Sequence, residues 1–170
     1  MKKTVLLFLA CMLVNTAAAN DSYSIYLVRH AEKLTDSNNP SLTVCGKQRA
    51  KQLASLLAKA NVSSIYSTSY QRTMQTARPL AKQSKIPVKN YSPRHLEQLA
   101  LLLKQKQENA LVVGHSNTTP MLVELLAKEQ VKPLTEQDYQ YLYQVQFVNQ
   151  KSVLTVLQQP LNCTVSPSDN

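Results

Sequence analysis

The sequence predicts an α/β protein, a three-layer α/β/α sandwich around a mostly parallel central sheet with an antiparallel edge. Three observations predict it. Short apolar runs alternate with stretches whose apolar residues recur at helical spacing. One run, Ala110 to Val113, is apolar at every position, which is typical of a strand covered on both faces. The last two runs are separated by only three residues, which indicates a hairpin at a sheet edge.

Six strands are predicted, each from a short run of β-branched, aromatic or other apolar residues. In chain order they cover Tyr23 to Val28, Val62 to Tyr66, Ile86 to Tyr91, Ala110 to Val113, Tyr141 to Val148 and Ser152 to Leu157. The last two strands are joined by Asn149-Gln150-Lys151 and form the predicted hairpin.

Four helices are predicted between these strands. In chain order they cover Gly46 to Ala60, Tyr70 to Gln83, Pro93 to about Gln107, and Thr118 to Ala127. The first has one apolar face, made of Ala50, Leu53, Ala54, Leu57 and Ala58. Pro79 should kink or interrupt the second helix, whereas Pro93 and Pro120 suit a first turn.

The first residues are predicted to be an export signal. Lys2 and Lys3 precede an apolar run from Thr4 to Val14 that is too short to span a bilayer, and Ala17-Ala18-Ala19 supplies a signal-peptidase site. We expect residues 1–19 to be removed and 20–170 to form one periplasmic or secreted domain, with no membrane span and with 158–170 as a tail. A lipoprotein signal acylated at Cys11 is the minor alternative.

Two cysteines, Cys45 and Cys163, remain after removal of the signal. In an oxidising compartment they predict either one disulfide, which would tie the tail to the start of the first helix, or two free thiols.

The chain is basic, with a formal net charge of +9 that falls to +7 once Lys2 and Lys3 are removed. This charge favours acidic ligands. The basic residues are scattered and form no stripe or RNA-binding motif, so a nucleic-acid partner is not expected.

Three segments place chemically active side chains just past predicted strands, where α/β sheets bind ligands. They read Arg29-His30-Ala31-Glu32-Lys33, Ser67-x4-Arg72-x3-Thr76-Ala77 and Gly114-His115-Ser116-Asn117-Thr118. An imidazole can attack phosphorus, and arginine offers donors that match phosphate oxygens. Two of the chain's three histidines follow apolar strands in this way. The backbone amides of Ser116 and Asn117 begin a helix, which is a second anion-binding position.

The ordered set of these three segments resembles the histidine phosphatase superfamily, also called the phosphoglycerate mutase-like family. The resemblance extends from about Ile25 to Leu157 and includes the segment Leu42-Thr43-x-x-Gly46-x-x-Arg49-Ala50. Ala31 stands where the family's opening Arg-His-Gly motif has glycine, as in other members with Arg-His-Ala-Glu-Lys.

The resemblance implies that His30 is the nucleophile and that Arg29, Arg72 and His115 surround the phosphoryl group. Lys33, Ser116 and Asn117 are further candidates for binding the substrate. The cationic side chains would take the place of Mg²⁺, so no metal or other cofactor is expected.

The residue that protonates the leaving group is harder to assign. Members that act on phosphomonoesters usually carry an acidic residue after the third strand, where this chain has Asn90 and Ser92. Glu97 lies a turn into the next predicted helix and Glu32 lies beside the nucleophile, so both are candidates. His95 is expected to be a surface residue.

The sequence therefore predicts an exported, metal-independent phosphatase that hydrolyses a phosphomonoester or related phosphate through phospho-His30. The expected partner is a small phosphorylated molecule, with a sugar phosphate of the cell envelope as one candidate. Two alternatives are a phosphate-binding pseudoenzyme and a protein that resembles phosphohistidine phosphatases and lacks a general acid. A mutase is disfavoured because the chain lacks the length for the insertions that hold a sugar phosphate. The sequence indicates no oligomeric state.

Overall fold

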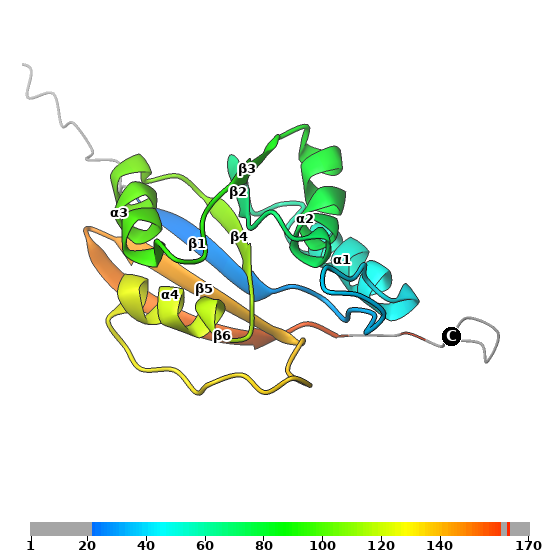
Figure 1. Ribbon diagram of the computed structural model, residues 1–170. Coiled ribbons are helices and arrows are strands. Elements are labelled where there is room, and N and C mark those ends of the chain that lie inside the picture. Colours follow the sequence, from blue (N-terminus) through cyan, green and yellow to red (C-terminus); the bar gives the residue numbers. More distant parts are fainter. Residues whose placement is uncertain (1–21, 161–162, 164–170) are drawn as a thin grey trace, which may run out of the picture.

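A six-stranded mixed sheet lies between two pairs of helices in the computed structural model, which describes residues 22–160 and Cys163 (Figure 1). The predicted signal, residues 1–19, and the alternative acylation site at Cys11 lie outside the described residues. The strands are β1 (Ser22–Arg29), β2 (Ser64–Ser67), β3 (Val88–Asn90), β4 (Ala110–Gly114), β5 (Tyr141–Val148) and β6 (Lys151–Gln158). The helices are α1 (Val44–Leu56), α2 (Gln71–Ser84), α3 (Leu96–Lys106) and α4 (Thr118–Ala127).

The sheet has the strand order β3-β2-β4-β1-β5-β6. Strands β1 to β4 are mutually parallel, while β5 runs antiparallel to β1 and β6 antiparallel to β5. The predicted fold class is therefore confirmed. In the register, Arg29 pairs with Gly114 and Ser67 with Val113, so the C-terminal ends of β1, β2 and β4 meet at one edge of the sheet.

Each face of the sheet has its own hydrophobic core. One core packs α3 and α4 against residues such as Ile25 and Leu27, and the other packs α1 and α2 against Val28 and Ile65. Because Leu27 and Val28 are neighbours on β1 and point to opposite faces, the strand must be apolar at both positions. Figure 1 shows α1 and α2 together on one side and α3 and α4 on the other.

Several helix and strand boundaries depart from the sequence prediction; for example, α1 covers Val44–Leu56 and not Gly46 to Ala60, and β3 covers only Val88–Asn90. Helix α3 begins at Leu96, not at Pro93, because the backbone N–H of His95 donates to the carbonyl of Ser92 and closes a turn first. Strand β6 begins at Lys151, because Asn149 and Gln150 alone make the turn, each with positive φ. Helix α2 is not interrupted at Pro79 and continues to Ser84.

The start of α1 is fastened to the loop after β1. The Thr43 hydroxyl caps the helix by accepting from the Gly46 N–H at 3.0 Å. Gly46 packs directly on the Glu32 carbonyl oxygen, and a Cβ at this position would overlap that oxygen. This close approach is the reason that the position requires glycine.

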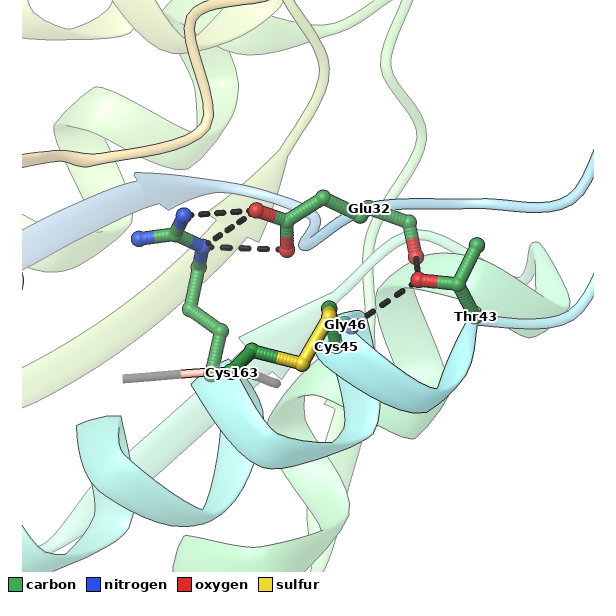
Figure 2. Close-up of a disulfide and its surroundings, with 6 residues drawn as sticks. Glu32, Thr43, Cys45, Gly46 and Cys163 are labelled. Atoms are coloured by element: carbon green, nitrogen blue, oxygen red, sulfur yellow. Dashed lines mark hydrogen bonds and ion pairs between the residues drawn. A yellow bond between two sulfur atoms is a disulfide. The ribbon is translucent and has the colours of Figure 1, made fainter. Parts of the chain in front are cut away.

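A disulfide joins Cys45 of α1 to Cys163 of the C-terminal segment, across 118 residues of sequence (Figure 2). The segment is also held at Gln159, which is buried and whose backbone N–H donates to the Gln140 carbonyl at 2.7 Å. Of the two alternatives for Cys45 and Cys163, a disulfide or two free thiols, the structure contains the disulfide. Within the described residues, no helix combines the length and apolar character needed to cross a bilayer.

Candidate active site

The three predicted segments meet in a pocket of about 400 Å³ at the C-terminal edge of the parallel strands. This volume is within the usual range of small-molecule sites. The pocket is lined by Arg29, His30, Lys33, Tyr70, Arg72, Pro93, Arg94, His115, Ser116, Asn117, Thr118 and Glu136. Four of these side chains are cationic and one is a carboxylate, so the pocket suits an anion.

His30 lies at the floor of the pocket and is 2% exposed. Its Nδ1 is 2.8 Å from the Ala31 carbonyl oxygen, and because a carbonyl can only accept, Nδ1 carries the proton. The Nε2 lone pair is therefore free. Burial lowers the pKa of His30 to about 3, a shift to which the charges of Arg29 and Arg72 add, so the ring is neutral near pH 7.

The backbone around His30 is fixed on both sides. Its own N–H donates to the Gly114 carbonyl at 3.0 Å, and the Ala31 N–H donates to the Thr76 hydroxyl at 3.0 Å. The Thr76 hydroxyl in turn donates to the Arg72 carbonyl. The backbone that carries His30 is thus held by β4 and α2 together, which limits the positions that its ring can take.

Arg29 is buried under the connection between α4 and β5. Its Nη1 donates to the Thr135 carbonyl at 2.7 Å, and its Nη2 donates to the Glu136 carboxylate at 2.9 Å. The ring of Tyr139 lies 4.2 Å from the guanidinium carbon.

Arg72 is in the first turn of α2 and is half-buried. Its guanidinium carbon lies 4.5 Å from the centre of the Tyr70 ring, and burial lowers its pKa. Within the described part of the chain, the buried Nε atoms of Arg29 and Arg72 have no hydrogen-bond partner. Both arginines therefore retain a donor that an anion can use.

His115 follows β4 and its Nε2 lies 3.0 Å from the hydroxyl of Thr68. That hydroxyl is also 2.9 Å from the Thr73 hydroxyl, and both threonines are fully buried. Burial lowers the pKa of His115 to about 4, helped by the nearby charges of Arg72 and Arg29. The neutral rings of His30 and His115 meet edge to face, with centroids 5.6 Å apart.

The three candidate substrate-binding residues all line the pocket. Lys33 and Ser116 are half-buried and Asn117 is exposed at the start of α4. The structure therefore brings together Arg29, His30, Arg72 and His115 with Lys33, Ser116 and Asn117.

The two candidate proton donors lie elsewhere. The Glu32 carboxylate is bound by the guanidinium of Arg49, whose Nε is 3.0 Å from both carboxylate oxygens. Glu97 is exposed and lines a separate groove beside α3 and α4 together with Met121 and Leu125. Neither residue lines the pocket that contains His30. His95 is exposed, as expected, and lines the same groove as Glu97.

Several residues at the site had no signal strong enough to identify them from the sequence. Glu136 and Tyr139 belong to an irregular connection with no periodicity, and Arg94 follows a proline in a turn. Thr68 could have been found, because it precedes Arg72 in the second segment and threonine hydroxyls often hold neighbouring groups. Among the described residues, no group of three or more His, Cys, Asp or Glu side chains is arranged to hold a metal ion.

Part of the chain matches a known protein family. Residues 25–98 match the family model of the histidine phosphatase superfamily (branch 1). The search of the curated proteins found no match.

Solved structures share the fold. The protein histidine phosphatase SixA, complexed with tungstate, aligns with a TM-score of 0.66 and 15% identity over 80% of this chain and 97% of SixA. The mycobacterial glucosyl-3-phosphoglycerate phosphatase aligns with a TM-score of 0.65 and 13% identity over 82% of this chain and all of that one. A phosphoserine phosphatase mutant from Entamoeba histolytica, in complex with phosphoserine, aligns with a TM-score of 0.60 and 18% identity over 78% of this chain and 95% of its own.

The matched residues 25–98 contain Arg29, His30 and Arg72, and the fold supplies His115 to the same pocket from β4. Residues 25–98 therefore resemble the histidine phosphatase superfamily (branch 1), and the chain has the fold of the solved phosphatases named above.

Proposed function

We propose that this protein hydrolyses phosphomonoesters in two steps, with the phosphoryl group carried transiently on Nε2 of His30. One observation carries the proposal. The Nδ1 proton is held on the Ala31 carbonyl at 2.8 Å, which leaves Nε2 unprotonated at the floor of a cationic pocket. Fixing the tautomer of a neutral imidazole in this way prepares its other nitrogen for attack.

In the first step, Nε2 forms a bond to phosphorus as the bond from phosphorus to the leaving oxygen breaks. In the second, a water oxygen attacks phosphorus, the bond between phosphorus and Nε2 breaks, and inorganic phosphate leaves. Arg29 and Arg72 oppose the negative charge on the equatorial oxygens in both transition states. Their donors are already in place, so little reorganisation accompanies the reaction.

The proposed substrate is a small phosphorylated molecule, with a sugar phosphate of the cell envelope as one candidate. The pocket has room for a phosphate and a small organic group. Two structural neighbours are phosphatases named for small phosphorylated compounds, glucosyl-3-phosphoglycerate and phosphoserine. Export to the periplasm or beyond is part of the proposal, and two features support it: the leader pattern in residues 1–19 and the disulfide between Cys45 and Cys163.

The test is to incubate residues 20–170 with an activated aryl phosphate, to follow turnover, and to trap the adduct by rapid denaturation. An acid-labile, base-stable phosphate on His30 is expected. His30→Ala should lose both turnover and adduct, whereas His95→Ala, which removes an exposed histidine outside the pocket, should keep both. Turnover that survives in His30→Ala at the wild-type rate would exclude the mechanism.

The alternative of a phosphate-binding module that has lost catalysis predicts a different result. Inorganic phosphate would bind, measured by calorimetry, with no turnover and no adduct from any phosphate tested. An enzyme that resembles phosphohistidine phosphatases would instead turn over phosphorylated imidazoles and leave alkyl phosphates intact.

A further inference from the structure

Glu136 is the carboxylate that lines the phosphate pocket, and no other acidic side chain of the described residues does so. It lies between α4 and β5. Its Oε2 accepts a hydrogen bond from Nη2 of Arg29 at 2.9 Å, and its Oε1 accepts from the Ser116 hydroxyl at 3.3 Å. Its side chain is 68% exposed, so it stands at the mouth of the pocket while His30 lies at the floor.

The backbone that carries Glu136 is held in place. The carboxylate of Asp138 accepts from both the N–H and the hydroxyl of Thr135, each at 2.7 Å. The carbonyl of Thr135 accepts from Arg29, and the ring of Tyr139 covers the same guanidinium. Contacts on both sides of Glu136 therefore fix its position over the pocket.

The geometry of phosphoryl transfer relates the position of Glu136 to the leaving oxygen. In an in-line displacement, the leaving oxygen departs on the side of phosphorus opposite to the nucleophile. Since His30 is at the floor, the leaving oxygen points to the mouth, where Glu136 stands. An alkoxide is a poor leaving group unless it receives a proton as it departs.

We propose that Glu136 is the proton donor and acceptor of the reaction, and that the substrates are phosphomonoesters of alcohols. This proposal rests on the proposed function. In the first step, the leaving oxygen takes the proton of the Glu136 carboxyl group and departs as an alcohol. In the second, the Glu136 carboxylate takes a proton from the attacking water, the electron pair of the bond between phosphorus and nitrogen returns to Nε2, and Glu136 is again protonated.

The electrostatics of the site account for the protonation of Glu136 during the cycle. In the free protein, the charge of Arg29 lowers the pKa of the Glu136 carboxyl group. A bound dianionic phosphoryl group neutralises Arg29 and brings negative charge close to the carboxylate, and both changes raise this pKa. Glu136 is solvent-exposed, so it takes up its proton from water when substrate binds and releases it when phosphate leaves.

The experiment compares Glu136→Gln with wild type on phosphates of one series, from nitrophenyl through phenyl to alkyl leaving groups. We expect kcat/KM of Glu136→Gln to fall by about 10²–10⁴-fold for the alkyl phosphate, the usual contribution of a general acid. For the nitrophenyl ester the loss should be under about tenfold, because that leaving group needs little protonation. Glu97→Gln is the matched control, because it removes a carboxylate from the adjoining groove, and it should follow wild type throughout.

Each remaining outcome overturns the proposal. An equal loss across the series would mean that Glu136 only supports the fold of the pocket. Tighter phosphate binding with unchanged kcat would mean that the carboxylate merely competes with substrate for Arg29. If Glu97→Gln shows the dependence on the leaving group, the donor is Glu97. Thermal unfolding of both variants checks the fold, and a wild-type protein without turnover or adduct would overturn the proposed function itself.

Discussion

The carboxylate of Glu32 is bound by the guanidinium of Arg49, so the acid two residues after His30 belongs to the framework of the pocket. Arg49 is buried in α1, and its Nη1 also reaches the Gln159 carbonyl near the C-terminal segment. The pair thus connects the loop after β1, helix α1 and the chain after β6. It stiffens the loop that begins with His30.

Replacing Arg49 by methionine should therefore lower stability and leave the chemistry in place. The free energy of unfolding should fall by about 1–3 kcal/mol, because a half-buried carboxylate loses its charged partner. Urea denaturation measures this loss. The control is Arg78→Met, which removes an exposed arginine of α2 and should change stability by under about 0.5 kcal/mol. Loss of the His30 adduct in a stable Arg49→Met protein would instead give Glu32 a part in the chemistry.

The disulfide between Cys45 and Cys163 should stabilise the folded chain. Opening a loop of 118 residues by Cys163→Ser is expected to cost about 2–5 kcal/mol. Cys45→Ser should give the same loss, and the double variant should lose no more than either single one, because one bond is broken in each case. Urea denaturation measures the losses, and mass spectrometry of the unreduced protein checks the bond. Two free thiols in exported protein would contradict the pairing.

Some elements of this fold can be predicted from the sequence, and others cannot. Helix α4 begins and ends as predicted, because Pro120 in its first turn and the apolar spacing that follows are local signals. The start of α3 was wrong, because the hydrogen bond from His95 to Ser92 forms a turn that suits Pro93 equally well. The pairing of Arg29 with Gly114 could be predicted, since parallel strands bring their C-terminal ends to one edge.

The position of Glu136 could not be predicted in the same way. Its connection has no periodicity, and its place over the pocket depends on contacts with Arg29, which lies 107 residues earlier. Similarly, no residue next to Glu32 in the sequence indicates that its side chain binds Arg49 and does not enter the pocket. Charged side chains in irregular segments are placed by tertiary partners, which a single sequence does not reveal.

Arg72 should carry a large part of the transition-state stabilisation. Removing one main donor to a developing negative charge typically lowers kcat by about 10²–10³-fold, which is the loss expected for Arg72→Ala. Steady-state kinetics with an aryl phosphate measures it. Arg78→Ala, six residues further along the same helix and exposed, is the control and should keep the wild-type kcat. A loss confined to KM would mean that Arg72 binds the ground state and the transition state equally.

Thr68 should act as a positioning residue for His115. Its hydroxyl lies 3.0 Å from Nε2, and the hydrogen bond between them holds the ring in one orientation. Thr68→Val keeps the shape of the side chain and removes this bond, so kcat should fall about tenfold with little change in KM. Thr68→Ser should restore most of the activity. An unchanged kcat in Thr68→Val would show that the ring of His115 is oriented by other contacts.

The two active-site histidines should make the protein less stable in mild acid. In the folded chain the pKa of His30 is about 3 and that of His115 about 4, whereas both are near 6.5 when unfolded. As pH falls below 6.5, the unfolded chain binds protons that the folded chain does not, so the free energy of unfolding decreases. The slope should approach about 1.4 kcal/mol per pH unit for each histidine near pH 5. Urea denaturation between pH 7 and 5 measures it, and His30→Asn should lose one histidine's share of the slope. An identical slope in His30→Asn would mean that His30 also takes up its proton in the folded protein.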